Sequence, residues 1–149
     1  MQPIHRAYLQ VNTDLNALTE VLSWFDQFND PPISYQTWLQ CQLALAEGFT
    51  NAVRHAHQGQ PVELPIDIEV VVWAEQLEMR IWDQGEPFNL LQKLDSLPQE
   101  MDSDAEGGRG LKLMQRIADS LSYIRTSDNR NCLLIIKHYS ESQGLEVSV

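Results

Sequence analysis

The spacing of hydrophobic and polar residues predicts two helices in the first third of the chain. Apolar residues recur at helical intervals over 15–25, after a capping residue at Thr13 or Asp14. A second helix begins at Ser34 and runs to about His57, where a Gln-Gly-Gln-Pro run follows. The positions that we expect it to bury are Trp38, Leu39, Leu43, Leu45, Ala46, Phe49 and Val53.

Elsewhere the apolar period is two over 7–11, 66–72 and 77–82, which predicts strands there. Two final strands are predicted near 122–126 and 132–138, joined by the turn residues Ser127-Asp128-Asn129-Arg130. The polar stretch 89–106 has no clear period. A third helix follows it, with an apolar face made by Leu111, Leu113, Met114, Ile117, Ala118 and Leu121. The resulting order, β-α-α-β-β-loop-α-β-β, predicts an α+β fold. We expect a two-layer α/β sandwich whose mixed, mostly antiparallel sheet is covered on one face by three helices.

Composition and charge narrow the function classes. The 149 residues carry 10 Lys and Arg against 21 Asp and Glu, a net charge of −11. Phosphate backbones and anionic membranes repel so acidic a chain, so we expect direct binding to neither. Without a signal-like or membrane-spanning apolar run, one cytoplasmic domain over 1–149 is expected. Cys41 and Cys132 are expected to be buried thiols, although two cysteines also permit one disulfide.

The first of three polar clusters with candidate chemistry lies on the second helix. Glu47, Asn51 and His55 follow one another at i, i+4 and i+8, so they share a face. That face is either a solvated helix edge or the wall of a site. Gly48 costs roughly 1 kcal/mol inside a helix, which close packing or close approach of a ligand would explain.

The other two clusters lie at a strand end and a helix start. Asp83-Gln84-Gly85-Glu86-Pro87-Phe88 is either a turn or a site where Asp83 accepts a hydrogen bond from a ligand amine. Gly85 would then let a flat ring lie against the backbone. Gly107-Gly108-Arg109-Gly110 is either a hinge or an anion site made by N–H groups at a helix N-terminus. No Gly-Lys-Ser/Thr follows, so it is not a Walker loop.

Taken in order, the three clusters resemble the GHKL ATP-binding superfamily: Glu-x-x-x-Asn on a helix, Asp-x-Gly-x-Pro-Phe after a strand, and Gly-Gly-Arg-Gly-Leu before a helix. The runs Asn51-Ala52-Val53-Arg54-His55 and 83–88 are similar to its anti-sigma-factor serine kinase branch, and the resemblance covers nearly the whole chain. It implies an anti-sigma factor and protein serine/threonine kinase. Such a protein binds ATP and Mg²⁺, sequesters a sigma factor and phosphorylates an anti-sigma-factor antagonist.

The resemblance implies roles for individual residues. Asn51 matches the asparagine that coordinates the Mg²⁺ bound to the nucleotide phosphates. Mg²⁺ is a hard ion that needs few protein ligands. Asp83 matches the aspartate that binds the adenine amino group, with Gly85 beside the ring, and Glu47 matches the proposed general base for the substrate hydroxyl. The residues expected at the phosphates are Gly107, Gly108, Arg109 and Gly110, together with Arg54.

Two departures from the family pattern bear on activity. Gly48 stands where related sequences more often carry alanine or a larger apolar residue. The presumed lid over 89–106 sets five acidic residues against Lys93, a charge that opposes a bound triphosphate. We expect Arg109 and Arg54 to offset it.

Two functions therefore stay open: the kinase, which Glu47 favours, and an ATP-dependent partner-switching module without phosphotransfer, for which Gly48 and the acidic lid leave room. A zinc site at His55, His57 and Glu47 is disfavoured because a His-x-His pair on a helix splays its rings apart. Since relatives in the branch dimerise, the resemblance also allows a homodimer.

Overall fold

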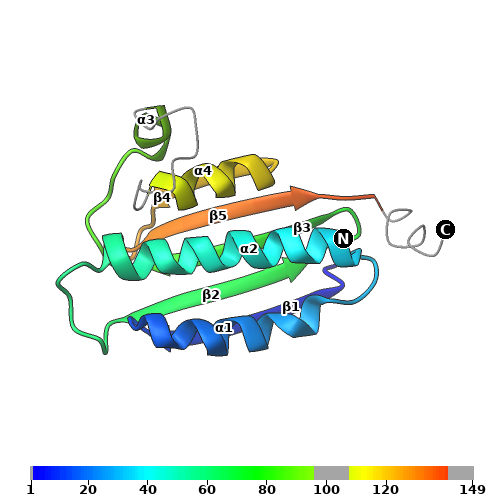
Figure 1. Ribbon diagram of the computed structural model, residues 1–149, viewed down its shortest axis with the longest axis horizontal. Coiled ribbons are helices and arrows are strands. Elements are labelled where there is room, and N and C mark those ends of the chain that lie inside the picture. The colour runs from blue at the N-terminus through cyan, green and yellow to red at the C-terminus, as the bar shows by residue number, and fades with distance from the viewer. Residues whose placement is uncertain (1, 96–107, 141–149) are drawn as a thin grey trace.

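The computed structural model describes residues 2–95 and 108–140, and within these it confirms the α+β class (Figure 1). Its strands form one five-stranded sheet in the order β1-β2-β3-β5-β4. Each neighbouring pair of these strands is antiparallel, so the sheet is not mixed. The strands are β1 (His5–Asn12), β2 (Pro65–Val72), β3 (Gln76–Asp83), β4 (Ser120–Arg125) and β5 (Asn131–His138).

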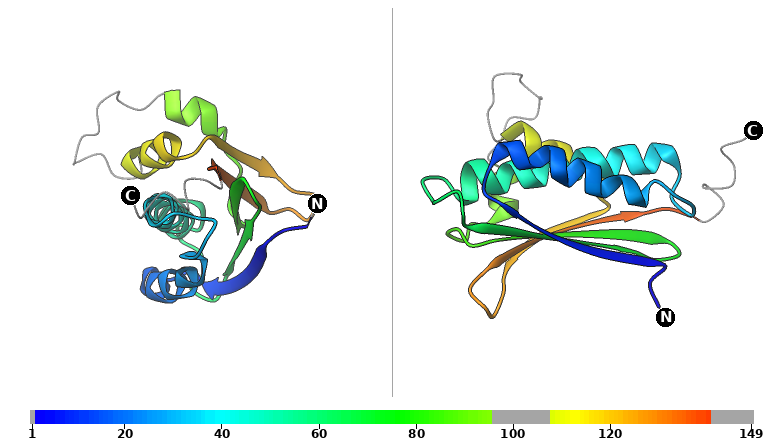
Figure 2. Two further views of the ribbon diagram at one scale, coloured as in Figure 1. Left: turned by 90° about the vertical axis from the view of Figure 1, so that its right-hand side faces the viewer. Right: turned by 90° about the horizontal axis from the view of Figure 1, so that it is seen from below.

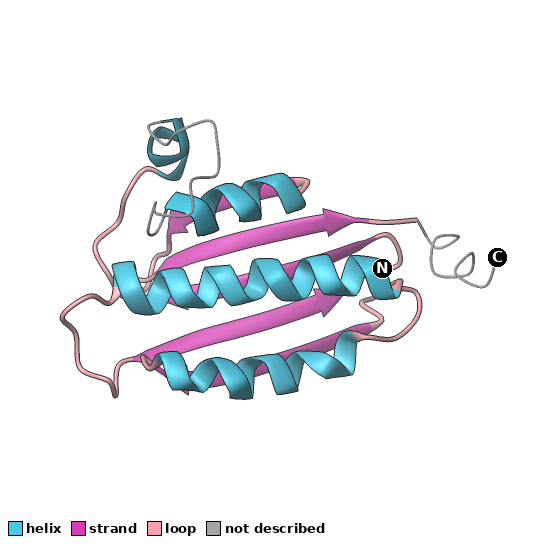
Figure 3. Ribbon diagram, viewed as in Figure 1, coloured by secondary structure: helices cyan, strands magenta, loops and turns pink. Residues whose placement is uncertain are grey.

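Three helices lie side by side on one face of this sheet (Figure 3), and the end-on view and the view from below show the two layers (Figure 2). They are α1 (Leu18–Phe25), α2 (Tyr35–Asn51) and α4 (Gly108–Ile117). The 3-10 turns Leu15–Ala17 and Asp26–Phe28 flank α1, and a short helix α3 (Leu90–Asp95) lies beyond the edge of the layer. None of the helices in the described residues is long and apolar enough to span a bilayer.

The second helix begins and ends where its sequence predicts. Ser34 Oγ accepts a hydrogen bond from the Thr37 N–H at 3.1 Å, which caps the first turn of α2. After Asn51 the helix continues as a π turn, Ala52–Ala56, in which the His57 N–H donates to Ala52 O at 2.9 Å. Such wider turns inside or at the end of helices are often found at functional sites.

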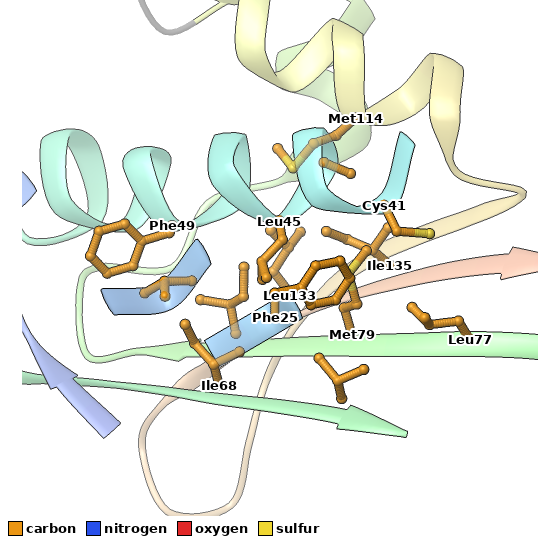
Figure 4. Close-up of a cluster of buried hydrophobic side chains, with 14 of the residues drawn as sticks. Phe25, Cys41, Leu45, Phe49, Ile68, Leu77, Met79, Met114, Leu133 and Ile135 are labelled. Atoms are coloured by element: carbon orange, nitrogen blue, oxygen red, sulfur yellow. The ribbon is translucent and has the colours of Figure 1, made fainter. Parts of the chain in front are cut away.

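The core lies between α2 and the sheet (Figure 4). Fully buried side chains include Phe25 from α1, Leu45 and Phe49 from α2, and Met79 and Ile135 from the sheet. Burial of each such side chain contributes about 1.5–3 kcal/mol. A Cβ on Gly48 would lie 2.5 Å from Ile81 Cδ1 and 3.3 Å from Leu133 Cδ2. The glycine is therefore explained by close packing of α2 on the sheet.

Two residues of α2 that were predicted to be buried are exposed. Leu39 and Leu43 are 40% and 45% exposed, whereas Thr37, Cys41 and Ala44 are buried. The helix is apolar on most sides, so periodicity alone could not choose the face, and the smaller residues let α2 approach the sheet. Cys41 and Cys132 are free and buried, and burial raises the pKa of Cys41 to about 12.

The region around α4 also differs from the prediction. Leu121 belongs to β4 because α4 already ends at Ile117. Gly108 and Gly110 lie inside the first turn of α4 rather than before it, and Gly107 lies outside the described residues. The short helix α3 was not expected in the polar stretch 89–106; Leu90 and Leu94, one turn apart, bury one side of it.

Candidate functional site

The end of α2 meets the end of β3, which brings the first two sequence clusters into contact. His57 Nε2 accepts a hydrogen bond from the Gln84 N–H at 2.8 Å. A Cβ on Gly85 would overlap the carbonyl oxygen of Ala56. Gly85 is thus required for the backbone of this loop to approach the π turn. The sequence had suggested a different reason for this glycine, the approach of a flat ring.

The third cluster joins them through Glu47. This half-buried residue of α2 places its carboxylate against the first turn of α4, where a Cβ on Gly110 would overlap Oε2. In Figure 1 the two helices lie next to each other, with the start of α4 near the C-terminal part of α2. The three clusters that are far apart in sequence are therefore neighbours in the fold.

Asp83 is the most deeply buried acidic residue of this region, with 2% of its surface exposed. Its Oδ1 accepts hydrogen bonds from the Gly85 N–H at 2.9 Å and from Asn131 Nδ2 at 2.8 Å. Its Oδ2 accepts one from the Tyr123 hydroxyl at 2.7 Å. These bonds compensate the burial of the charge. A carboxylate has about four lone-pair positions, so the three bonds from described residues leave one acceptor position for a further donor.

Tyr123 is held as a hydrogen-bond donor to Asp83. Burial and the adjacent Asp83 charge raise the pKa of its phenol, so the hydroxyl stays protonated. Its ring packs against Phe88 with the ring centres 4.6 Å apart. Both rings line a surface pocket of about 510 Å³ between the loop after β3 and strand β4, a size typical of small-molecule sites.

Two further polar residues of the site were missed by sequence reasoning. Asn131 faces Asp83 across the β3–β5 pair, and its Nδ2 also donates to Gly85 O at 2.9 Å. Arg125 donates to the same carbonyl at 3.2 Å and to Asn131 Oδ1 at 3.3 Å. An asparagine at the start of an apolar strand was a visible signal, but nothing local showed which strand β5 would pair with.

The remaining predicted residues take different positions. Asn51 is half-buried at the last position of α2, while Arg54 and His55 are exposed on the π turn. The polar stripe on α2 thus divides into a half-buried part near the other clusters and an exposed end. Arg109 belongs to the first turn of α4, and residues 96–106 of the presumed lid lie outside the described chain.

Comparison with known proteins agrees with this geometry. Residues 11–137 match the model of the histidine kinase-like ATPase domain family. That match includes α1, α2, α4 and most of the sheet.

Individual relatives point to one branch of the family. A protein of Listeria monocytogenes named serine-protein kinase RsbW is 30% identical over 115 residues, which cover 74% of this chain and 71% of the relative. Proteins with the same name from Bacillus pumilus and Bacillus licheniformis are 33% and 31% identical over 93 residues. The alignments cover 58% and 59% of this chain and 57% and 58% of those relatives. The chain therefore belongs to the family of histidine kinase-like ATPase domains, in the anti-sigma regulatory branch that its motifs indicated.

Proposed function

We propose that this chain is an anti-sigma factor and a protein serine/threonine kinase that uses Mg·ATP. The observation that supports the proposal most directly is the buried Asp83 carboxylate at the end of β3, whose three hydrogen bonds from described residues leave one acceptor position. The relatives named serine-protein kinase support the reaction class.

The adenine of ATP suits the site around Asp83. Its exocyclic amine is a donor, and Asp83 is an acceptor that is already fixed by Gly85, Asn131 and Tyr123. Guanine has a carbonyl oxygen at the corresponding position, and that oxygen would face the carboxylate as acceptor against acceptor. Asp83 therefore provides selection for ATP over GTP as well as affinity.

The phosphates would lie at the start of α4. Backbone N–H groups of a helix N-terminus, at Gly108, Arg109 and Gly110, favour anionic groups through the helix dipole. Asn51 offers an amide oxygen to Mg²⁺, and the phosphate oxygens and water would complete the shell. The bound ion would neutralise phosphate charge, a task to which Arg54 and the guanidinium of Arg109 would contribute.

Glu47 is the proposed general base. As the oxygen of a substrate serine or threonine attacks the γ-phosphorus, the bond to ADP breaks and Glu47 takes the hydroxyl proton. One observation favours the second candidate function, a partner switch without transfer. The Glu47 carboxylate contacts the first turn of α4, which is also the proposed phosphate site, and its negative charge there opposes a bound triphosphate.

The partners of the proposal are a sigma factor, which the chain would sequester, and an antagonist protein, which it would phosphorylate. With these partners, the chain would act in the cytoplasm. Residues 1–149 would form one domain, and the resemblance to the branch suggests a homodimer. The relatives' printed name supports a kinase and leaves the identities of both partners to experiment.

The proposal is tested in two stages. Calorimetry should show Mg·ATP binding by the wild type, with much weaker binding of Mg·GTP. Incubation with Mg·ATP and the cognate antagonist should then add one phosphate to a serine or threonine, detected by mass spectrometry. Glu47→Gln keeps the shape without the basic carboxylate, so it should bind Mg·ATP and not transfer. Binding without transfer in the wild type would leave the partner switch, and no binding would refute both functions.

A further inference from the structure

His57 connects three segments of the chain in the interior. It is 1% exposed and lies just after the π turn that ends α2. Its Nδ1 lies 2.7 Å from Oγ1 of Thr13, the residue that follows β1, and that hydroxyl donates to Leu64 O at 2.6 Å. Its Nε2 accepts the hydrogen bond from the Gln84 N–H at 2.8 Å.

This network determines the protonation state of the ring. The Gln84 N–H can only donate, so Nε2 carries no proton. The Thr13 hydroxyl uses its proton on Leu64 O, so it must accept at the other side, and Nδ1 carries the proton. The network therefore requires the neutral imidazole with its proton on Nδ1.

Gln84 lies between Asp83, the acceptor proposed for adenine, and Gly85, whose backbone contacts Ala56. We propose that His57 is a positioning residue of the nucleotide site: it holds the Gln84 backbone, and with it the Asp83–Gly85 turn, against the end of α2. This inference rests on the proposed binding of Mg·ATP. A phenylalanine of similar size would fill the space but would leave the Gln84 N–H without its acceptor.

The positioning depends on pH because a protonated ring donates from both nitrogens, and Nε2 would then face the Gln84 N–H donor to donor. Burial lowers the pKa of His57, while the Asp83 charge partly raises it. The other titratable groups on the segments around the ring are Asp14, Glu63, Glu86, Arg54 and His55. Asp14 uses its carboxylate on the Asn16 N–H, and the remaining four are exposed.

The test compares two variants in Mg·ATP titrations. His57→Gln keeps an acceptor oxygen for Gln84 but cannot titrate, so at about pH 8 it should bind within about threefold of the wild type. His57→Phe should bind about tenfold more weakly, since a buried N–H loses its partner. As the pH falls below the ordinary histidine value of about 6.5, the wild type should lose affinity faster than His57→Gln. Protonation of the nucleotide affects both proteins and cancels in that comparison.

His138→Gln is the matched control, because His138 is exposed at the far end of β5, and its pH profile should follow the wild type. A second measurement needs no nucleotide: ¹⁵N NMR should show Nε2 unprotonated and the Gln84 amide protected from exchange at neutral pH. Wild-type binding with equally tight binding by His57→Phe, parallel pH profiles for wild type and His57→Gln, or a protonated Nε2 would overturn the positioning role alone. Failure of the wild type to bind Mg·ATP would instead refute the proposed function, and this role with it.

Discussion

The carboxylate of Glu47 occupies the space that a side chain on Gly110 would need. Two helices that are separated by more than fifty residues of sequence thus meet through an acidic group at the start of α4, where the helix dipole favours negative charge. The absence of a side chain at Gly110 is what permits the contact. The position of the proposed general base, Glu47, next to the proposed phosphate site therefore depends on the glycine at residue 110.

Gly110→Ala should displace the Glu47 carboxylate from the start of α4 with little effect on the fold. The overlapping atom is the far end of the flexible Glu47 side chain, which can swing aside. Alanine also favours the helix by up to about 1 kcal/mol. We expect an unchanged or slightly higher free energy of unfolding and a fall in phosphotransfer comparable to that of Glu47→Gln. Lys112→Ala, also on α4, is the control. Full transfer activity in Gly110→Ala would show that the position of Glu47 is not critical.

The other two packed glycines should be far less tolerant. In Gly85→Ala the new Cβ would overlap the backbone oxygen of Ala56, which cannot move without its turn, and we expect a loss of about 2–4 kcal/mol. Gly48→Ala would press on the side chain of Ile81, at a cost of about 1–3 kcal/mol that improved helix propensity partly offsets. Urea unfolding should therefore rank Gly85→Ala below Gly48→Ala, and Gly48→Ala below Gly110→Ala. A reversed order would contradict the contacts described above.

Asp83→Asn should weaken ATP binding more than it weakens GTP binding. The amide keeps the shape but loses the charge, and its NH₂ can turn toward the adenine amine, donor to donor. Loss of a hydrogen bond to a charged group costs about 1.5–3 kcal/mol, or roughly a ten- to hundredfold rise in Kd. Calorimetry with both nucleotides measures the ratio. Equal affinity of Asp83→Asn and wild type for ATP would place the adenine elsewhere.

Asn51→Ala should show whether Asn51 binds Mg²⁺ or the nucleotide itself. Its expected role is on Mg²⁺, so affinity for ATP should fall when Mg²⁺ is present and change little when the ion is chelated. His55→Ala, one turn further along and exposed, is the matched control and should resemble the wild type in both conditions. An equal loss with and without Mg²⁺ would assign Asn51 to the nucleotide itself or to the fold.

Stability should fall in mild acid through His57, independently of nucleotide. Burial holds the pKa of His57 below its unfolded value, so the unfolded chain binds the proton more readily. The contribution is complete above the ordinary value of about 6.5 and is lost as the pH falls through the lower folded value. His57→Gln should remove this part of the pH dependence of urea midpoints, whereas His138→Gln should retain it. Identical profiles for wild type and His57→Gln would contradict the assignment.

Short stretches of the sequence were enough to predict most of the secondary structure and the family of this protein. Alternation predicted β1, β2 and β3 to within a few residues, and the turn residues 127–130 marked the strands β4 and β5 on either side. The Ser34 cap and helical spacing predicted α2 together with its extension toward His57. The order of the three polar clusters identified the family. Such features depend on neighbouring residues along the chain, because strand pleating, helix periodicity and capping are short-range effects.

The tertiary structure decided which distant atoms meet. Pairing of β3 with β5 put Asn131 opposite Asp83, and the approach of α2 to β3 gave His57 its bond to Gln84. The same packing left Leu39 exposed although its sequence environment is as apolar as that of its buried neighbours. The reason is physical: pairing, burial and the clearance around a glycine depend on groups tens of residues away, whose positions a local pattern does not contain.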